Sequence, residues 1–271
     1  MNINLSRLAN IISFEMIRLF KTKRGLLSLL AFATIWFIIL YYFVSSAADI
    51  VNSQSFESIA ADLFGALGLS SLLQWPVAEY AIYWLVAVYF FPIFALSVCS
   101  DQICSDKQRG TLRFLTLRST RTEIILGRYL GQLFIVAVLI LMSSVATAIL
   151  ASMRDLSLLP ASLQLGAKLS FEVIIVVMPF IALMTLLNTW VHSARLAIVT
   201  AVLFFSLGPL VTAFIGYQFG HEFYLNLLFP GEQIESILSQ RGDVTSQYWL
   251  PLMQTLVLLF TSNLVMKRAS L

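Results

Sequence analysis

The chain has 271 residues, of which 59% are hydrophobic and 11% are charged, and its formal net charge is +3. A soluble domain carries about 25% charged residues, so this composition excludes a soluble enzyme and an intrinsically disordered chain. The apolar residues form long unbroken runs, which disfavours a transmembrane β-barrel with its alternating strands. We therefore expect an all-α, polytopic membrane protein that forms a single transmembrane domain over residues 1–271.

Residues 3–22 have a helical periodicity but are too polar to span a membrane. Leu8, Ile12 and Leu19 share one face of such a helix, whereas Arg7 and Arg18 lie on the opposite face. This pattern predicts an amphipathic helix that lies in the membrane interface. A helix packed against the base of the protein itself is the alternative that the pattern leaves open.

Six apolar runs are each long enough to cross a hydrocarbon core, which takes about 20 residues. The predicted spans are Gly25–Ser46, Val77–Cys99, Ile124–Ala151, Leu169–Trp190, Ala194–Phe219 and Tyr248–Met266. In the third span, Gly127 and Gly131 are four residues apart and allow another helix to approach closely. We expect packing within the chain at this pair rather than dimerisation.

Basic residues gather on one side of this topology. Of the 17 Lys and Arg residues, 14 fall in the N-terminal segment, the loop before the third span with the foot of that span, the turn after the fourth span, and the C-terminus. The positive-inside rule then places both termini and the loop 100–123 in the cytoplasm.

Motifs of the common enzyme classes are missing from the sequence. It has no P-loop, no G-x-G-x-x-G and no G-x-S-x-G. His221-Glu222 starts like a zinc motif, but Leu225 stands where the second histidine is required. We therefore expect no catalytic site, no bound metal, no cofactor and no nucleic-acid partner for this chain.

Glu172 is the best candidate for a functional charge within the spans, because ionisable residues in membrane helices commonly mark a substrate or ion pathway. It falls near the outer end of the fourth span, where a structural role or a place in a vestibule is the alternative to direct substrate contact.

Residues 220–246 hold two short apolar stretches on either side of Pro230-Gly231. Neither is long enough to span, so we expect a re-entrant helical hairpin that dips into the outer leaflet under a protein cover. A surface loop with two helical turns is the alternative. The four residues Leu228, Phe229, Pro230 and Gly231 are the expected outer gate.

The loop 101–120 before the third span carries two capping-box patterns, Ser105 with Gln108 and Thr120 with Glu123. They predict a short helix, a turn and then the start of the span. Such a helix suits docking into a partner's groove, although anchoring of the chain by its positive charges explains the same residues.

Two blocks in this region, 106–112 and 117–128, resemble the signature of the ABC-2 type permeases, the membrane subunits of ATP-binding-cassette exporters. Three positions depart from that signature: Arg118 replaces a proline, Arg128 a lysine and Gln108 an acidic residue. The short length and the missing outer domain are most similar to permeases of nitrous-oxide-reductase maturation transporters. By this resemblance, the ATPase-coupling residues are Asp106, Lys107, Gln108, Arg109, Gly110, Thr111, Leu112, Arg113 and Arg121.

The resemblance implies a subunit of the bacterial inner (plasma) membrane that pairs with a second copy of itself in the lipid bilayer. Two separate ATPase subunits, which bind ATP and Mg, would dock beneath the 101–120 helix and the N-terminal helix. The assembly would move cargo outward or transmit force to a periplasmic partner. A secondary, ion-coupled transporter and a membrane assembly factor are the alternatives that the sequence leaves open.

Overall fold

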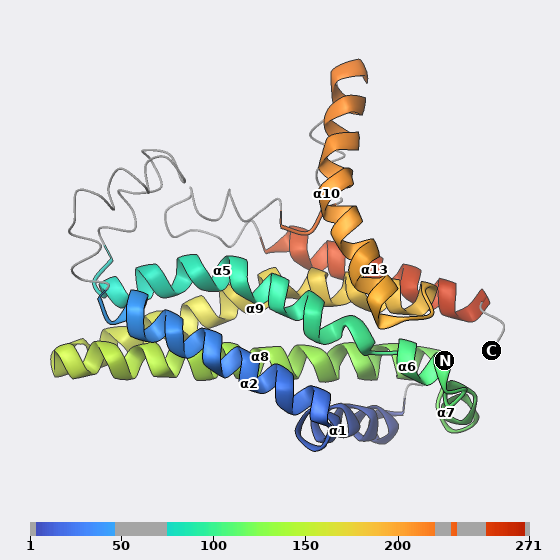
Figure 1. Ribbon diagram of the computed structural model, residues 1–271, viewed down its shortest axis with the longest axis horizontal. Helices are drawn as coiled ribbons and strands as arrows, with labels where there is room; N and C mark the ends of the chain where they lie inside the picture. The colour runs from blue at the N-terminus through green and yellow to red at the C-terminus, as the bar shows by residue number, and fades with distance from the viewer. Residues whose placement is uncertain (1–3, 47–74, 220–228, 232–247, 269–271) are drawn as a thin grey trace.

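The computed structural model describes residues 4–46, 75–219, 229–231 and 248–268, and every regular element in these ranges is a helix (Figure 1). The elements are α1 (Leu5–Lys21), α2 (Lys23–Ile38), the π-helix η1 (Ile39–Val44), α5 (Ala78–Val98), the 3-10 helix η2 (Cys99–Asp101), α6 (Cys104–Gln108), α7 (Leu112–Arg118), α8 (Arg121–Arg154), the 3-10 helix η3 (Leu156–Leu158), α9 (Leu159–Trp190), α10 (Ala194–Phe219) and α13 (Trp249–Arg268).

Within these described ranges, six helical segments are long and apolar enough to cross a membrane, as the sequence predicts. They are Gly25–Val44, Ala78–Gln108, Arg121–Arg154, Leu156–Trp190, Ala194–Gln218 and Trp249–Arg268. α8 has 34 residues and α9 has 32, so each is about 50 Å long and exceeds a hydrocarbon core of about 30 Å. The helix that contains the fourth predicted span begins at Leu159, ahead of the predicted start at Leu169.

Four helices, α5, α8, α9 and α13, run side by side along the long axis of the molecule, with α9 among the other three (Figure 1). The apolar stretch of α9 is 78% buried, whereas the corresponding stretch of α10 is only 11% buried. Figure 1 shows α10 leaving the bundle at a steep angle. α9 is thus the central helix of the core, and α10 exposes an apolar surface over most of its length.

Aromatic rings attach α2 to α5. The rings of Phe32 and Phe94 have centroids 5.0 Å apart, and those of Trp36 and Phe91 are 5.4 Å apart. Tilted aromatic pairs at these separations add stability beyond the apolar area that they bury. This contact holds α2 against the bundle although most of its apolar surface stays exposed.

One end of the bundle carries α1, α6, α7 and the C-terminal ends of α9 and α13, and we call it the basic end (Figure 1). The 101–120 segment is not a single helix there. Gly110 has φ +69°, a left-handed conformation that ends α6 and separates it from α7. A residue with a side chain is strained in this conformation, so the glycine makes the break.

One of the two predicted capping boxes is present. Thr120 and Glu123 form both reciprocal bonds at the start of α8. The prediction for Ser105 was wrong, because α6 begins at Cys104 and the backbone N–H of Ser105 donates to Oδ1 of Asp101 at 3.0 Å. The carboxylate of Asp101, which lies one turn earlier, takes the place of the hydroxyl.

Candidate functional site

Two glycines of α8 form the surface on which α1 packs. A Cβ atom added at Gly127 would lie 2.8 Å from the side chain of Ile11, and one at Gly131 would lie 2.9 Å from Cβ of Glu15. Both distances are shorter than a normal carbon contact, so only glycine permits this approach. The prediction that this pair serves packing within the chain is confirmed.

An ion-pair network lies beneath this contact. Arg128 and Glu15 are only 2% and 1% exposed, and Nη1 of Arg128 donates to Oε1 of Glu15 at 2.6 Å. The same nitrogen donates to the backbone carbonyl of Gln102, and Nη2 pairs with Oδ2 of Asp106. Nε2 of Gln132 donates to the second oxygen of Glu15 at 2.8 Å. One arginine of α8 thereby joins α1 to α6.

Further polar contacts extend the network. Nη2 of Arg18, on α1, lies 3.2 Å from Oδ2 of Asp101 and donates to the carbonyl of Asp101 at 2.7 Å. Oδ1 of Asp106 accepts from the hydroxyl of Thr111 at 2.9 Å, across the turn at Gly110. α1 therefore contacts the loop directly at Asp101, and Asp106 also fixes the α6–α7 turn.

Lys107 and Arg121 bind the C-terminal ends of two long helices. Nζ of Lys107 donates to the carbonyls of Asn188 and Val191 at 3.0 and 3.3 Å, at the end of α9. Nη1 of Arg121 donates to the carbonyls of Met266 and Lys267, at the end of α13. Cations satisfy the free carbonyls at helix C-termini and complement the helix dipole. Lys107 thus connects α6 to α9, and Arg121 connects the start of α8 to α13.

The other predicted coupling residues divide into an exposed and a buried group. Leu112 is buried and anchors α7 against Ile124 and Ile125 of α8. The remaining members, Gln108, Arg109, Gly110, Thr111 and Arg113, are exposed. Phe114 and Leu117 on α7 are 71% and 81% exposed. The α6–α7 segment therefore presents apolar and cationic side chains together on its outer surface.

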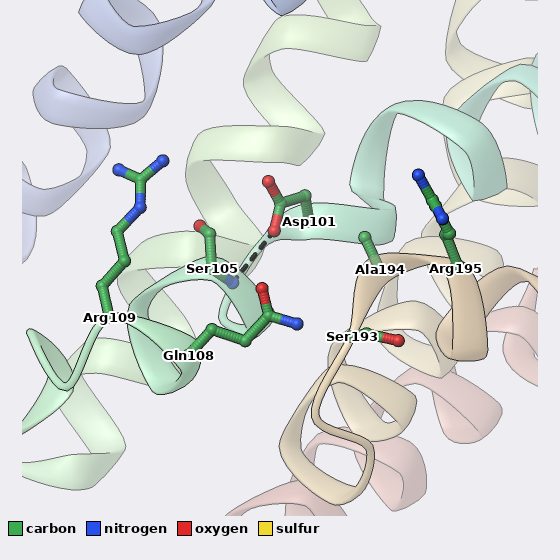
Figure 2. Close-up of a pocket in the computed structure, with 7 residues that line it drawn as sticks. All are labelled: Asp101, Ser105, Gln108, Arg109, Ser193, Ala194 and Arg195. Atoms are coloured by element: carbon green, nitrogen blue, oxygen red, sulfur yellow. Dashed lines mark hydrogen bonds between the residues drawn. The ribbon is translucent and has the colours of Figure 1, made fainter.

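A cavity of about 510 Å³ lies between α6 and the turn that leads into α10 (Figure 2). Figure 2 shows the bond between Asp101 and Ser105 at the cavity, with Arg109 on the α6 side and Arg195 on α10. The cavity separates the α6 segment from the start of α10. Among the described residues, no group of three or more His, Cys, Asp or Glu could hold a metal ion.

Glu172 is far from the basic end and is buried, with 5% of its surface exposed. Its Oε1 accepts from the hydroxyl of Tyr248 at 3.4 Å. Another buried carboxylate, Glu79, forms an ion pair with Nε of Arg154 at 3.1 Å. Glu172 is thus placed inside the bundle beside the first turn of α13, where it has a polar partner.

Most of the predicted hairpin, including Leu228, lies outside the described residues. The ring of Phe229 lies 4.8 Å from that of Phe204, and a Cβ at Gly208 would lie 2.1 Å from Cε1 of Phe229. Pro230 is buried and Gly231 has φ +105°. The turn at 229–231 therefore packs into a notch that Gly208 leaves on α10.

Several residues of the network escaped the sequence analysis. Glu15 is the one acidic residue of α1 and lies on its protein-facing side, which was the available signal. Arg128 appeared only as a departure from the permease signature. Asn188, whose side-chain amide donates to the carbonyl of Cys99 at 3.0 Å, gave no signal, because an asparagine in an apolar run has no recognisable spacing.

In the part of the chain that the structure describes, these features define a helical protein with six helices able to cross a membrane and a charged network at one end of the bundle. Residues 66–269 match the family described as "Protein of unknown function (DUF2705)", and the chain belongs to this family. The match includes the described elements from α5 to α13, and therefore Arg128 but not Glu15. A comparison with curated proteins found no match.

Proposed function

We propose that this chain is the permease subunit of an ATP-binding-cassette exporter, in which two copies pair in the bacterial inner membrane above two separate ATPase subunits. The observation that carries the proposal is the network at the basic end. Arg128 binds Glu15 of α1 and Asp106 of α6 from its place on α8. A push on the exposed α6–α7 segment is thus applied to a spanning helix and to α1 at once.

Lys107 of the same segment holds the end of α9, and Arg121, the first residue of α8, holds the end of α13. In the proposed mechanism, the ATPases bind the exposed surface of α7 around Leu117. Their closure on ATP and Mg moves this surface and tilts the spans.

The proposal includes an orientation with both termini in the cytoplasm. α1 lies in the inner interface, where Phe14, Ile17 and Phe20, which are about half exposed on its free side, enter the lipid. The 220–246 segment forms a re-entrant outer hairpin with its gate at 228–231, and Glu172 lines the vestibule beneath it. α2 and α10, which expose most of their apolar surface, form the contact between the two copies.

The proposal requires an ATP-binding-cassette ATPase encoded near this chain, and the decisive experiment is reconstitution of the chain with that ATPase. We expect a stable complex whose ATP hydrolysis is faster in the presence of the permease. Leu117→Asp should lower copurification and stimulation, whereas Met153→Asp, an equally exposed change at the other end of α8, should not. Full stimulation by the Leu117 variant would contradict the docking surface, and the lack of any ATPase partner would contradict the whole proposal.

An ion-coupled secondary transporter is the rival that one observation favours, namely the buried Glu172 with its tyrosine partner. It predicts uptake that follows an ion gradient without an ATPase and is lost in Glu172→Gln. The exporter proposal predicts that this variant keeps ATPase docking and stimulation. A membrane assembly factor would show neither transport nor stimulated hydrolysis.

A further inference from the structure

A second and larger cavity at the basic end is lined by positively charged side chains. It has a volume of about 1010 Å³ and opens between α7, the turn after α9, and the last turn of α13. Arg109, Arg113 and Arg268 line it, together with Lys107 and His192, and no carboxylate is among the described residues that line it. We call it the cationic groove.

The positive charge of this groove is available to a ligand. Lys107 is engaged by the carbonyls of α9, so it neutralises the negative end of that helix, as Arg121 does for α13. Within the described part of the chain, neither Arg113 nor Arg268 has a carboxylate within ion-pairing distance. Two guanidinium groups therefore face the groove without a carboxylate partner among the described residues.

Apolar side chains share the groove with these cations. Trp190 ends α9, Phe114 projects from α7 and Val265 belongs to the last turn of α13. Trp190 is 67% exposed, and an exposed tryptophan at the end of a spanning helix is typical of the membrane–water boundary. A ligand that fills the groove must therefore be anionic on one side and apolar on the other.

We propose that the cationic groove binds the headgroup of an anionic phospholipid from the cytoplasmic leaflet. Basic pockets between spanning helices on the cytoplasmic side commonly bind the headgroups of anionic lipids. The acyl chains would extend along the exposed apolar face of α13, where Val257 and Phe260 are 55% and 63% exposed. Bound lipid bridges α7 to α13 and thereby stabilises the α6–α7 segment against the bundle. The inference rests on the proposed orientation but requires no ATPase.

The test measures thermal unfolding of the purified full-length chain in detergent as phosphatidylglycerol or phosphatidylcholine is added. We expect phosphatidylglycerol to raise the unfolding temperature and phosphatidylcholine to have little effect. Each arginine near an anionic membrane surface contributes about fivefold to binding, so Arg113→Gln with Arg268→Gln should weaken it about thirtyfold. The matched control replaces Lys21 and Lys267, two exposed lysines that do not line the groove, and should bind as the wild type does.

Equal effects of the two lipids, or an equal loss in the control variant, would overturn the proposal. Full competition by glycerol phosphate would overturn it in favour of a soluble anion, and displacement of phosphatidylglycerol by a polyglutamate peptide in favour of an acidic protein segment. Because the chain is measured alone, lipid binding without ATPase stimulation would refute only the exporter function. Stimulation without lipid binding would refute only the groove.

Discussion

Arg128 has ionic contacts on both sides, with Glu15 of α1 and Asp106 of α6, and almost no exposure to water. Desolvation of such a charge is unfavourable, and only its partners offset the cost. A buried ion pair of this kind adds little net stability, but removing one of its partners lowers the stability of the protein strongly. Its value to the protein is then the fixed geometry of three elements.

Arg128→Leu should lower the free energy of unfolding by about 3 kcal/mol, because Glu15 then stays buried with only the longer ion pair to Arg18, at 3.7 Å, to offset its charge. Glu15→Leu should have a similar effect, and the double variant should lose much less than the sum of the two. Denaturant unfolding of the four proteins in a double-mutant cycle measures this coupling. Additive losses would show that the pair does not act as a unit.

Gly110 offers a second test. Glycine is required at this position because φ is +69°, and not because a side chain would lack space. A Cβ atom there would meet no other atom within 4 Å. Gly110→Val should cost about 1–2 kcal/mol through backbone strain, and Gly110→Asn clearly less, since asparagine tolerates this conformation. Thermal unfolding compares the two variants, and equal losses would contradict the assignment to strain.

The sequence predicted residues of the basic end unevenly. Thr120 and Glu123 were found because a capping box is a local pattern, and Gly110 because it stands in a signature block. The bonds of Lys107 to α9 and of Arg121 to α13 join residues 81 and 145 positions apart. No periodicity encodes such pairs, so the assignment of both residues to a partner ATPase stays a prediction beside their observed internal contacts.

At the scale of elements, the packing of α1 on α8 depends on glycine. Gly131→Leu should displace α1, because even a Cβ at this position lies 2.9 Å from Glu15 and 3.5 Å from the backbone of Ile12. We expect hydrogen exchange of the amides in residues 5–21 to become much faster. Val145→Leu, an exposed change on the same helix, is the control. Unchanged protection in the glycine variant would show that α1 is held by its ends alone.

The notch on α10 predicts a compensating pair. Gly208→Ala places a methyl group where the ring of Phe229 lies, and overpacking of this kind typically costs about 1–3 kcal/mol. Phe229→Ala removes the ring, so the loss of stability in the double variant should be smaller than the sum of the two single losses. Thermal unfolding of the wild type and the three variants is the measurement. If the losses are additive, Phe229 does not occupy the notch.

The existence of the six spans could be read from the sequence because each is a long apolar run, and length alone separates it from a loop. The ends of these helices could not be read from the sequence. α9 begins at Leu159 since Pro160 suits a first helical turn, although the stretch that follows is too polar to count as a span. The break between α6 and α7 was likewise missed, because a single glycine within a polar loop resembles an ordinary turn.

At the scale of the whole molecule, orientation decides whether the basic end can meet an ATPase. The distribution of 14 of 17 basic residues predicts that this end faces the cytoplasm. Ser119→Cys, after α7, should react with an impermeant thiol reagent only in opened cells. Gln233→Cys, in the segment outside the described residues, should react in intact cells. Cys99 and Cys104 are both buried, so the wild type supplies an unlabelled background.

The reverse labelling pattern would place α7 and the cationic groove outside the cell, where no ATPase and no cytoplasmic lipid could reach them. Both proposals would then fail together, whereas the network of Arg128 and the packing of α1 would be unaffected.

Labelling of both positions from outside would instead mean that an odd number of the helices between residues 119 and 233 do not cross the membrane. Three helices in that interval, α8, α9 and α10, are each long and apolar enough to cross, and this outcome would require one of them to remain outside the bilayer. α10, whose apolar stretch is only 11% buried in the bundle, would be the first to test by the same method, with a cysteine at its exposed Tyr217.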